Sequence, residues 1–465
     1  MHNYPKTRRT LYFLRVRLPY LTINQKEVYE MFQTYEEALQ WIHGRLRLGI
    51  KPGLTRMHIM MEKLGFPEKK IKTIHIGGTN GKGSTVTYLR SILESAGLMV
   101  GTFTSPYIEQ FNERISINGV PIADEEITKL ANILFPIVEE MDKEELGGPT
   151  EFEIITAMSF YYFANVQTPD IVLYEVGLGG RFDSTNIINP LLSIITSIGL
   201  DHTAILGETY GEIAFEKAGI IKENTPIIAA VKQEEAKDVI VRRAQEENAP
   251  YYLLGKHFEL ENYQSNEDGE SFTFKTAATK LTNLQIGMLG EHQVENASLA
   301  VMAALLLKGE LCLSEEHIQK GLLHARWTGR LDVLSKHPYV LVDGAHNQEG
   351  IEALVEVLES RYKDKKKSIL FAALSDKKTD KMIGQLDKAA ADITFTSFDF
   401  PRAATGEALY TDSHHPNKSF TNDWKKAITD KLEAMNESEM LVITGSLYFL
   451  SNVLAFFKEQ NLGEK

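Results

Sequence analysis

Residues 77–84 read Gly-Gly-Thr-Asn-Gly-Lys-Gly-Ser, and they constrain the fold of this chain more than any other segment. They follow an apolar run that ends at residues 74–76 and precede a helix-like run over residues 85–96. This order predicts a strand, a tight loop and a helix, the βα unit of a parallel sheet. Glycines let such a loop turn its N–H groups toward phosphate oxygens, and the positive end of the helix dipole favours the same charge. We therefore expect an α/β fold built around a phosphate-binding loop.

The lysine and serine of this loop carry the expected chemistry. Lys82 would reach the terminal phosphates of a nucleotide, and Ser84 would offer its hydroxyl to Mg²⁺. The pattern G-x-x-x-x-G-K-[ST] is not met literally, because Ile76 stands at the first Gly position and Gly83 separates Lys82 from Ser84. An ordinary glycine-rich turn is the alternative, but a strand, a helix and a lysine together favour ATP. The predicted ATP contacts are Gly78, Thr79, Asn80, Gly81, Lys82, Gly83 and Ser84.

Length and charge limit the classes of partner. A chain of 465 residues is expected to form at least two domains. The formal charge of −13 argues against nucleic acid, because phosphate backbones select clustered Lys and Arg. The longest strictly apolar run, residues 299–307, is too short to span a bilayer, so no membrane partner is expected. The single cysteine, Cys312, excludes an internal disulfide and favours a reducing, cytoplasmic location.

Short apolar runs alternate with helical patterns over most of the chain, which predicts a doubly wound, mostly parallel sheet. The expected strands of this first domain are residues 71–76, 100–104, 170–176, 192–198 and 226–231. A polar, alternating segment suggests a small β-rich insertion at residues 258–287, and a long helix follows over residues 292–307. A second α/β alternation starts near residue 330, with strands expected at 340–342, 368–372, 393–395 and 441–444. We predict an N-terminal P-loop ATPase domain, residues 31–329, and a smaller C-terminal Rossmann-like α/β domain, residues 330–465.

Two polar residues lie at or just past the ends of predicted strands of the first domain. Glu175 ends an apolar strand, and burial of its carboxylate is costly unless a cation or hydrogen bonds compensate it. A Mg²⁺ ion held together with Ser84 would do so, and an ion pair with Arg181 is the alternative. His202 follows another strand, although a lone histidine is more often structural than a ligand.

The exact residues of the loop also carry a family resemblance. Residues 78–84 look like the nucleotide loop of folylpolyglutamate synthases, which are relatives of the Mur ligases of cell-wall synthesis. Further segments resemble the family in the expected order: residues 105–115, 175–186, 199–202, 216–222, 327–331, 343–347 and 444–446. The resemblance runs from about Met31 to about Phe456 and is specific as a set.

The resemblance implies an activity. It predicts an ATP-dependent ligase that adds L-glutamate in γ-linkage to tetrahydrofolate through an acyl phosphate, with dihydropteroate as a further candidate acceptor. The expected partners are folate, L-glutamate and ATP, with Mg²⁺ at two sites, and we expect a monomer. The catalytic residues carried over are Lys82, Lys217 and His346.

The family pattern also assigns the metal ligands Ser84, Glu175, His202 and Lys217. In the family this lysine is carbamylated by CO₂, which turns an ammonium into an anionic carbamate. A lysine paired with Glu216 or Glu212 is the alternative. Asp201 could orient His202.

Folate contacts are implied for Phe182, Asp183 and Ser184, and for Phe152 and Glu153. Phe182 could stack on a flat heterocycle and Asp183 could accept hydrogen bonds from its amino group, although both aromatic rings could simply belong to the core. In the segment of residues 105–115, Tyr107 replaces a histidine that is frequent in the family. The resemblance therefore assigns no folate contact to this segment.

The remaining family positions lie near the predicted junction and in the second domain. Asn296, Arg330 and Asp343 are assigned to ATP, and His346 and Ser446 to the incoming glutamate.

Two rivals remain open. A Mur-type ligase of cell-wall synthesis would usually carry a precursor-binding domain ahead of the loop, and only about forty residues separate Met31 from the strand at Ile71. A nucleotide-binding switch would hydrolyse ATP without ligation.

The first thirty residues differ from the rest of the chain. Six Lys or Arg face two acids, and Arg15, Arg17 and Pro19 interrupt any apolar segment of a signal peptide. An Arg-rich transit peptide is the alternative. Because the resemblance begins at Met31, we expect residues 1–30 to be non-essential.

Overall fold

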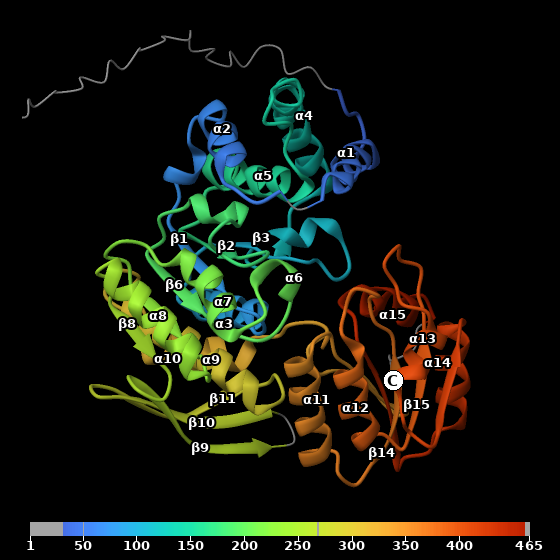
Figure 1. Ribbon diagram of the computed structural model, residues 1–465. Coiled ribbons are helices and arrows are strands. Elements are labelled where there is room, and N and C mark those ends of the chain that lie inside the picture. The colour runs from blue at the N-terminus through green and yellow to red at the C-terminus, as the bar shows by residue number, and fades with distance from the viewer. Residues whose placement is uncertain (1–30, 50, 267–268, 461–465) are drawn as a thin grey trace, which may run out of the picture.

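The computed structural model describes residues 31–49, 51–266 and 269–460, and it confirms the predicted α/β fold (Figure 1). A large sheet of eight strands has the order β4-β3-β2-β5-β1-β6-β7-β8. Six neighbouring strands, from β2 to β8, are parallel, and β3 and β4 extend that edge in antiparallel pairing. The strands are β1 (Thr73–Gly77), β2 (Val100–Phe103), β3 (Ile115–Ile117), β4 (Val120–Pro121), β5 (Ile171–Glu175), β6 (Leu192–Ile195), β7 (Ile227–Ala229) and β8 (Tyr251–Leu253).

Helices cover both faces of this sheet. One face packs against α3 (Lys82–Ser95), α9 (Glu291–Leu307) and α10 (Glu315–His324). The other face carries two groups, α1 (Tyr35–His43), α2 (Thr55–Lys63), α4 (Asp124–Met141) and α5 (Glu151–Asn165), then α7 (Tyr210–Lys217) and α8 (Glu234–Glu246). A short helix α6 (Thr203–Leu206) lies ahead of α7. With both faces covered, the central strands are buried along their whole length, which explains their nearly continuous apolar sequence.

The β-rich segment expected at residues 258–287 forms a three-stranded antiparallel sheet of β9 (Phe258–Asn266), β10 (Gly269–Thr276) and β11 (Lys280–Ile286). Its inner face joins the core under α9 and α10.

A second, six-stranded sheet follows, with the order β12-β13-β17-β14-β15-β16. Its strands are β12 (Asp332–Lys336), β13 (Tyr339–Val342), β14 (Lys366–Phe371), β15 (Asp392–Thr396), β16 (Lys418–Thr421) and β17 (Glu439–Thr444). Its helices are α11 (Gln348–Ser360), α12 (Thr379–Ala389), α13 (Gly406–Asp412), α14 (Trp424–Ala434) and α15 (Leu447–Glu459). All strands are parallel except β12.

The boundary at residues 329–330 stays a prediction; β12, the first strand of the second sheet, begins at Asp332. Residues 1–30, which we expect to be non-essential, lie outside the described residues. In the part of the chain that the structure describes, no helix combines the length and apolarity that crossing a membrane requires.

Candidate active site

The phosphate loop, residues 77–84, leaves the end of β1 and enters α3 at Lys82, as predicted. Gly81 has a φ of 87°, and a Cβ there would lie 2.1 Å from Asn296 Oδ1. The glycine is therefore required both by its backbone and by the close approach of Asn296 from α9. Two of the predicted ATP residues, Gly81 and Asn296, are thus brought into contact.

Lys82 and Lys217 converge on this loop. Lys82 Nζ donates to the carbonyls of Gly78 at 3.2 Å and Thr79 at 3.1 Å, and Lys217 Nζ donates to the same Gly78 carbonyl at 2.9 Å. Burial lowers the pKa of Lys217 to about 7, and the Lys82 charge acts in the same direction. Burial also lowers the pKa of Lys82. Lys217 therefore reaches the loop rather than Glu212, which instead caps its own helix.

Glu175 ends β5 beside the loop and is buried. Burial raises the pKa of its carboxyl to about 7 although Lys82 opposes this, and its hydrogen bond from the Ser105 N–H is long, at 3.4 Å. The alternative partner, Arg181, instead places its guanidinium 3.9 Å from the centre of the Phe215 ring.

A poorly compensated buried carboxylate of this kind suits a cation. Ser84, also buried, lies in the first turn of α3. Among the described residues no three His, Cys, Asp or Glu side chains are grouped as a metal site, so the protein donors for an ion here would be Glu175 and Ser84, with phosphate or water completing the shell.

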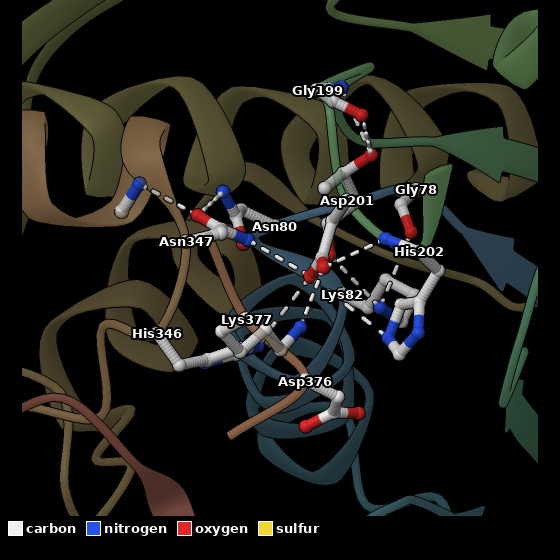
Figure 2. A network of polar contacts seen from close by, with 12 residues as sticks. Gly78, Asn80, Lys82, Gly199, Asp201, His202, His346, Asn347, Asp376 and Lys377 are labelled. Atoms are coloured by element: carbon white, nitrogen blue, oxygen red, sulfur yellow. Dashed lines mark hydrogen bonds and ion pairs between the residues drawn. The ribbon is translucent and has the colours of Figure 1, made fainter. Parts of the chain in front are cut away.

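Asp201 is the centre of a polar network that joins both halves of the molecule (Figure 2). Its Oδ1 accepts from Lys377 Nζ at 2.5 Å, and its Oδ2 accepts from Asn347 Nδ2 at 3.2 Å. His346 Nε2 and His202 Nε2 lie 3.8 and 3.9 Å from Oδ2. Burial opposes ionisation of Asp201, but the Lys377 ammonium, which also donates a hydrogen bond, outweighs it and holds the pKa of this carboxyl well below its usual range.

A pair of amides connects the phosphate loop to the second sheet. Asn347 caps α11, because its Oδ1 accepts the Gly350 N–H at 2.8 Å. The same oxygen accepts from Asn80 Nδ2 at 3.0 Å, and Asn347 Nδ2 donates to Asn80 Oδ1 at 2.9 Å. Beside them, Glu349 Oε1 accepts the N–H of Leu200 at 2.8 Å. The nucleotide loop and the second sheet therefore meet directly.

Asp343 and Arg330 lie at this junction. The Asp343 carboxylate accepts the N–H groups of Leu331 and Ala345, both at 2.8 Å, so it ties the connecting segment to the end of β13. Burial raises the pKa of Asp343, and the Arg330 charge opposes the shift. Arg330 is also within electrostatic range of Lys82 and Glu175 on the other side of the junction.

The predicted glutamate residues follow β13 and β17. His346 Nδ1 lies 2.8 Å from the Gly344 carbonyl, and burial lowers its pKa to about 4, so the ring is neutral near pH 7. Ser446 is buried at the N-terminus of α15, where its hydroxyl caps the Phe449 N–H.

The predicted folate residues separate into two environments. Phe182 is 53% exposed, which excludes the core alternative for this ring, whereas Asp183 and Ser184 are buried. Phe152 packs against Gly177, where a Cβ would lie 2.5 Å from the ring. Glu153 lies inside the helical layer, paired with Arg56 Nε at 2.9 Å; its folate contact stays a prediction.

Four residues of these networks were not predicted. Lys377 and Asn347 lie 176 and 146 residues from their partner Asp201, and no local pattern reveals such a contact. Asn347 is nevertheless part of the motif at residues 343–347. His75 and Thr185 form a buried hydrogen bond beside the predicted folate residue Asp183, and a lone polar residue in an apolar strand was the available signal for His75.

Comparison with known proteins identifies a known domain family in each half of the chain. The Mur ligase middle domain matches residues 76–304, and the Mur ligase glutamate ligase domain matches residues 329–447. A dihydrofolate synthase/folylpolyglutamate synthase of Bacillus subtilis (strain 168) is 49% identical over 91% of this chain and 99% of its own length.

Solved structures are similar over the same extent. Mycobacterium tuberculosis folylpolyglutamate synthase complexed with ADP aligns with a TM-score of 0.85 and 27% identity, covering 91% of this chain and 99% of that one. An FPGS–AMPPCP–folate complex aligns with a TM-score of 0.80 and 29% identity, covering 92% and 100%. This chain therefore belongs to the folylpolyglutamate synthase/dihydrofolate synthase family of the Mur ligase superfamily.

Proposed function

We propose that this protein is an ATP-dependent ligase that joins the amino group of L-glutamate to the γ-carboxylate of a folate. The observation that carries the proposal is the network around Asp201, which gathers the phosphate loop, two histidines and Lys377 at the junction of the two sheets. A ligation of this type needs the phosphorylated acid and the incoming amine at one protected place.

The chemistry divides into two transfers. The folate carboxylate attacks the terminal phosphorus of ATP, so an acyl phosphate forms and ADP leaves. The glutamate amine then attacks the acyl carbon, the C–N bond forms and phosphate leaves. Lys82 would exchange its two carbonyl contacts for phosphate oxygens, which bind an ammonium more strongly. Mg²⁺ held by Glu175 and Ser84 would supply positive charge for the transferred phosphoryl group.

Neutral His346 is suited to the incoming amine. Its Nδ1 must carry the proton, because the Gly344 carbonyl opposite it can only accept. The Nε2 lone pair is then free to accept a hydrogen bond from the glutamate amino group. Ser446, close by at the start of α15, would contact a glutamate carboxylate.

Lys217 would become a carbamate, the amine nitrogen bonding to the carbon of CO₂ with release of one proton. As an ammonium Lys217 does not suit a cation site; as a carbamate, with His202, it would hold a second Mg²⁺. Its burial and lowered pKa support this reaction, which needs the neutral amine. We further propose ATP contacts from Asn296, Arg330 and Asp343, a folate site that includes Phe152 and Phe182, a monomer, and a cytoplasmic location.

The test is glutamate-dependent release of ADP by the purified protein with tetrahydrofolate as acceptor, and dihydropteroate as a second acceptor. A product one glutamate heavier is expected, and with tetrahydrofolate as acceptor tandem mass spectrometry should show a γ-linkage. ADP release that ignores both glutamate and folate would favour the nucleotide switch. Turnover only with a nucleotide-linked cell-wall precursor would favour the Mur-type alternative.

A further inference from the structure

We propose that His75 is a positioning residue for folate: it acts through Thr185 and Asp183 on the β5 loop, residues 177–183, which carries the exposed Phe182. The inference rests on the proposed function, because it takes a folate as the ligand of this loop. The carrying observation is an unbroken chain of hydrogen bonds from the central strand of the sheet to the loop backbone.

His75 lies in the middle of β1, where it pairs in register with Tyr174 of β5 and Ser193 of β6. Its neighbours Ile74 and Ile76 belong to the core on the α3 side, so the alternation of a strand turns His75 to the opposite face. The imidazole is completely buried there, and its Nε2 lies 2.8 Å from Thr185 Oγ1.

The direction of each hydrogen bond can be deduced. An ionised carboxylate only accepts, so the Thr185 hydroxyl donates to Asp183 Oδ1 at 2.5 Å. The Thr185 oxygen must then accept from His75, which places the proton of the ring on Nε2. Nδ1 is left buried, with no hydrogen-bond partner among the described residues. Burial lowers the pKa of His75 to about 3, so the ring is neutral; an apolar side chain would avoid the cost of the unpaired Nδ1, and packing alone therefore does not explain a histidine at this position.

Asp183 carries the chain into the loop. Its Oδ2 accepts the Leu178 N–H at 2.8 Å, and its Oδ1 accepts the Thr185 N–H at 3.0 Å. The carboxylate therefore ties the start of the β5 loop to Thr185, two residues beyond its end. These two bonds, the Thr185 hydroxyl and a further backbone hydrogen bond from Gly177 occupy about four acceptor positions. Asp183 consequently shapes the loop, and Phe182 beside it is the group presented to a ligand.

Loss of one link weakens the hold on Asp183 Oδ1, which then depends on the Thr185 N–H, so the loop presents Phe182 in a less uniform conformation. Binding of folate must then order the loop, and the free-energy cost of this ordering, which is absent from the native protein, weakens folate binding. We expect the KM for tetrahydrofolate to rise about tenfold, with kcat and the KM for ATP within about twofold of the native values.

The experiment compares substitutions that break a link with substitutions that keep it. Thr185→Val and His75→Leu remove a hydroxyl or a donor, whereas Thr185→Ser and His75→Gln retain one. Ser193→Ala is the matched control, because Ser193 is equally buried on the neighbouring strand and its hydroxyl bonds the Ile220 carbonyl at 3.0 Å instead of the β5 loop. Only the two link-breaking variants should raise the folate KM; all five are to be compared in melting temperature.

An equal rise in folate KM for Ser193→Ala, or none for Thr185→Val, overturns the proposal. Long-range ¹H–¹⁵N spectra of histidine give a second readout, since His75 should be the neutral Nε2–H tautomer and should shift in Thr185→Val. An Nδ1–H tautomer in the native protein also overturns it. If the native enzyme fails to ligate tetrahydrofolate at all, the proposed function fails, which is a different result from native ligation with an unaffected Thr185→Val variant.

Discussion

Two glycine-rich loops leave neighbouring strands of the large sheet, and they use their polar side chains in opposite ways. The phosphate loop follows β1, and its Gly78 carbonyl accepts from two lysines, Lys82 of the loop itself and Lys217 at the end of α7. The β5 loop follows β5, and its Asp183 is committed to the loop backbone and to Thr185. In the phosphate loop, lysine side chains bond only to neutral carbonyls. In the β5 loop, the Asp183 carboxylate bonds to groups of the loop and of Thr185, and so holds the loop in one conformation.

The difference indicates which contacts a ligand has to replace. A carbonyl is a weaker partner for an ammonium than a phosphate oxygen, so the lysine contacts of the phosphate loop are readily exchanged when a nucleotide arrives. The Asp183 contacts are multiple, short and buried, so they persist. Substitutions in the first loop should therefore affect turnover, and those behind the second should affect folate affinity.

The largest effect is expected for Lys82→Met. Methionine keeps the length of the side chain but removes the charge that would neutralise the transferred phosphoryl group, and kcat should fall at least about 100-fold. The melting temperature should not fall, because burial already disfavours the Lys82 ammonium in the folded protein. Steady-state kinetics and thermal unfolding measure both; native-like turnover would remove the phosphate loop from the mechanism.

The next largest effect is expected for Lys217→Ala, which cannot form a carbamate and should lose about 100-fold in kcat. Acetate should restore part of the rate by supplying a carboxylate. A ¹³C resonance of the carbamate should appear after ¹³CO₂ labelling of the native enzyme and be absent from the variant. If no resonance appears at saturating CO₂, Lys217 acts as an amine.

The lowered pKa of Lys217 sets the pH dependence of this step. CO₂ adds only to the neutral amine, whose fraction rises as pH increases through about 7. At a fixed concentration of dissolved CO₂, the fraction of enzyme that carries the carbamate should therefore increase between pH 6 and pH 8. A lysine that kept its ordinary pKa of 10.5 would remain almost wholly protonated over this range, and its carbamate fraction would stay small. A rate that falls over this range would contradict the assignment.

A smaller effect is expected for His346→Ala on the opposite side of the junction. The substitution removes a neutral acceptor for the glutamate amine, and the KM for glutamate should rise roughly tenfold, the size of one lost hydrogen bond. The KM for ATP should change by less than about twofold. Equal changes in both constants would show that His346 serves the junction as a whole.

The sequence predicted the parts of the molecule that local patterns determine. The local pattern predicts the strand, glycine loop and helix around Lys82. It also predicts β5, β6 and β17, because buried parallel strands are short and almost wholly apolar. Glu175 stands out for the same reason, as a charge at the end of such a run.

Other features have no local signal. β12 and β16 are short edge strands with polar residues, so no apolar run marks them. The contact between Asn80 and Asn347 joins residues 267 positions apart, and it forms only because two sheets meet with their strand ends facing each other. The hydrogen-bond chain behind Asp183 likewise depends on β1 and β5 being neighbours, an order that crosses the sequence.

The smallest effect is expected for deletion of residues 1–30, which removes no residue of either loop. The first described residues are anchored without it: Phe32 exchanges two backbone hydrogen bonds with the Asn132 side chain, both at 2.9 Å, and its ring packs against Trp41 and Phe135. A chain beginning at Met31 keeps all of these contacts, so its melting temperature should stay within about 2 °C and its ligase rate within about twofold of the full chain. A clear loss of rate at unchanged melting temperature would show that the N-terminal segment takes part in the reaction. The phosphate loop and the β5 loop would then not be the only segments that determine turnover and folate affinity.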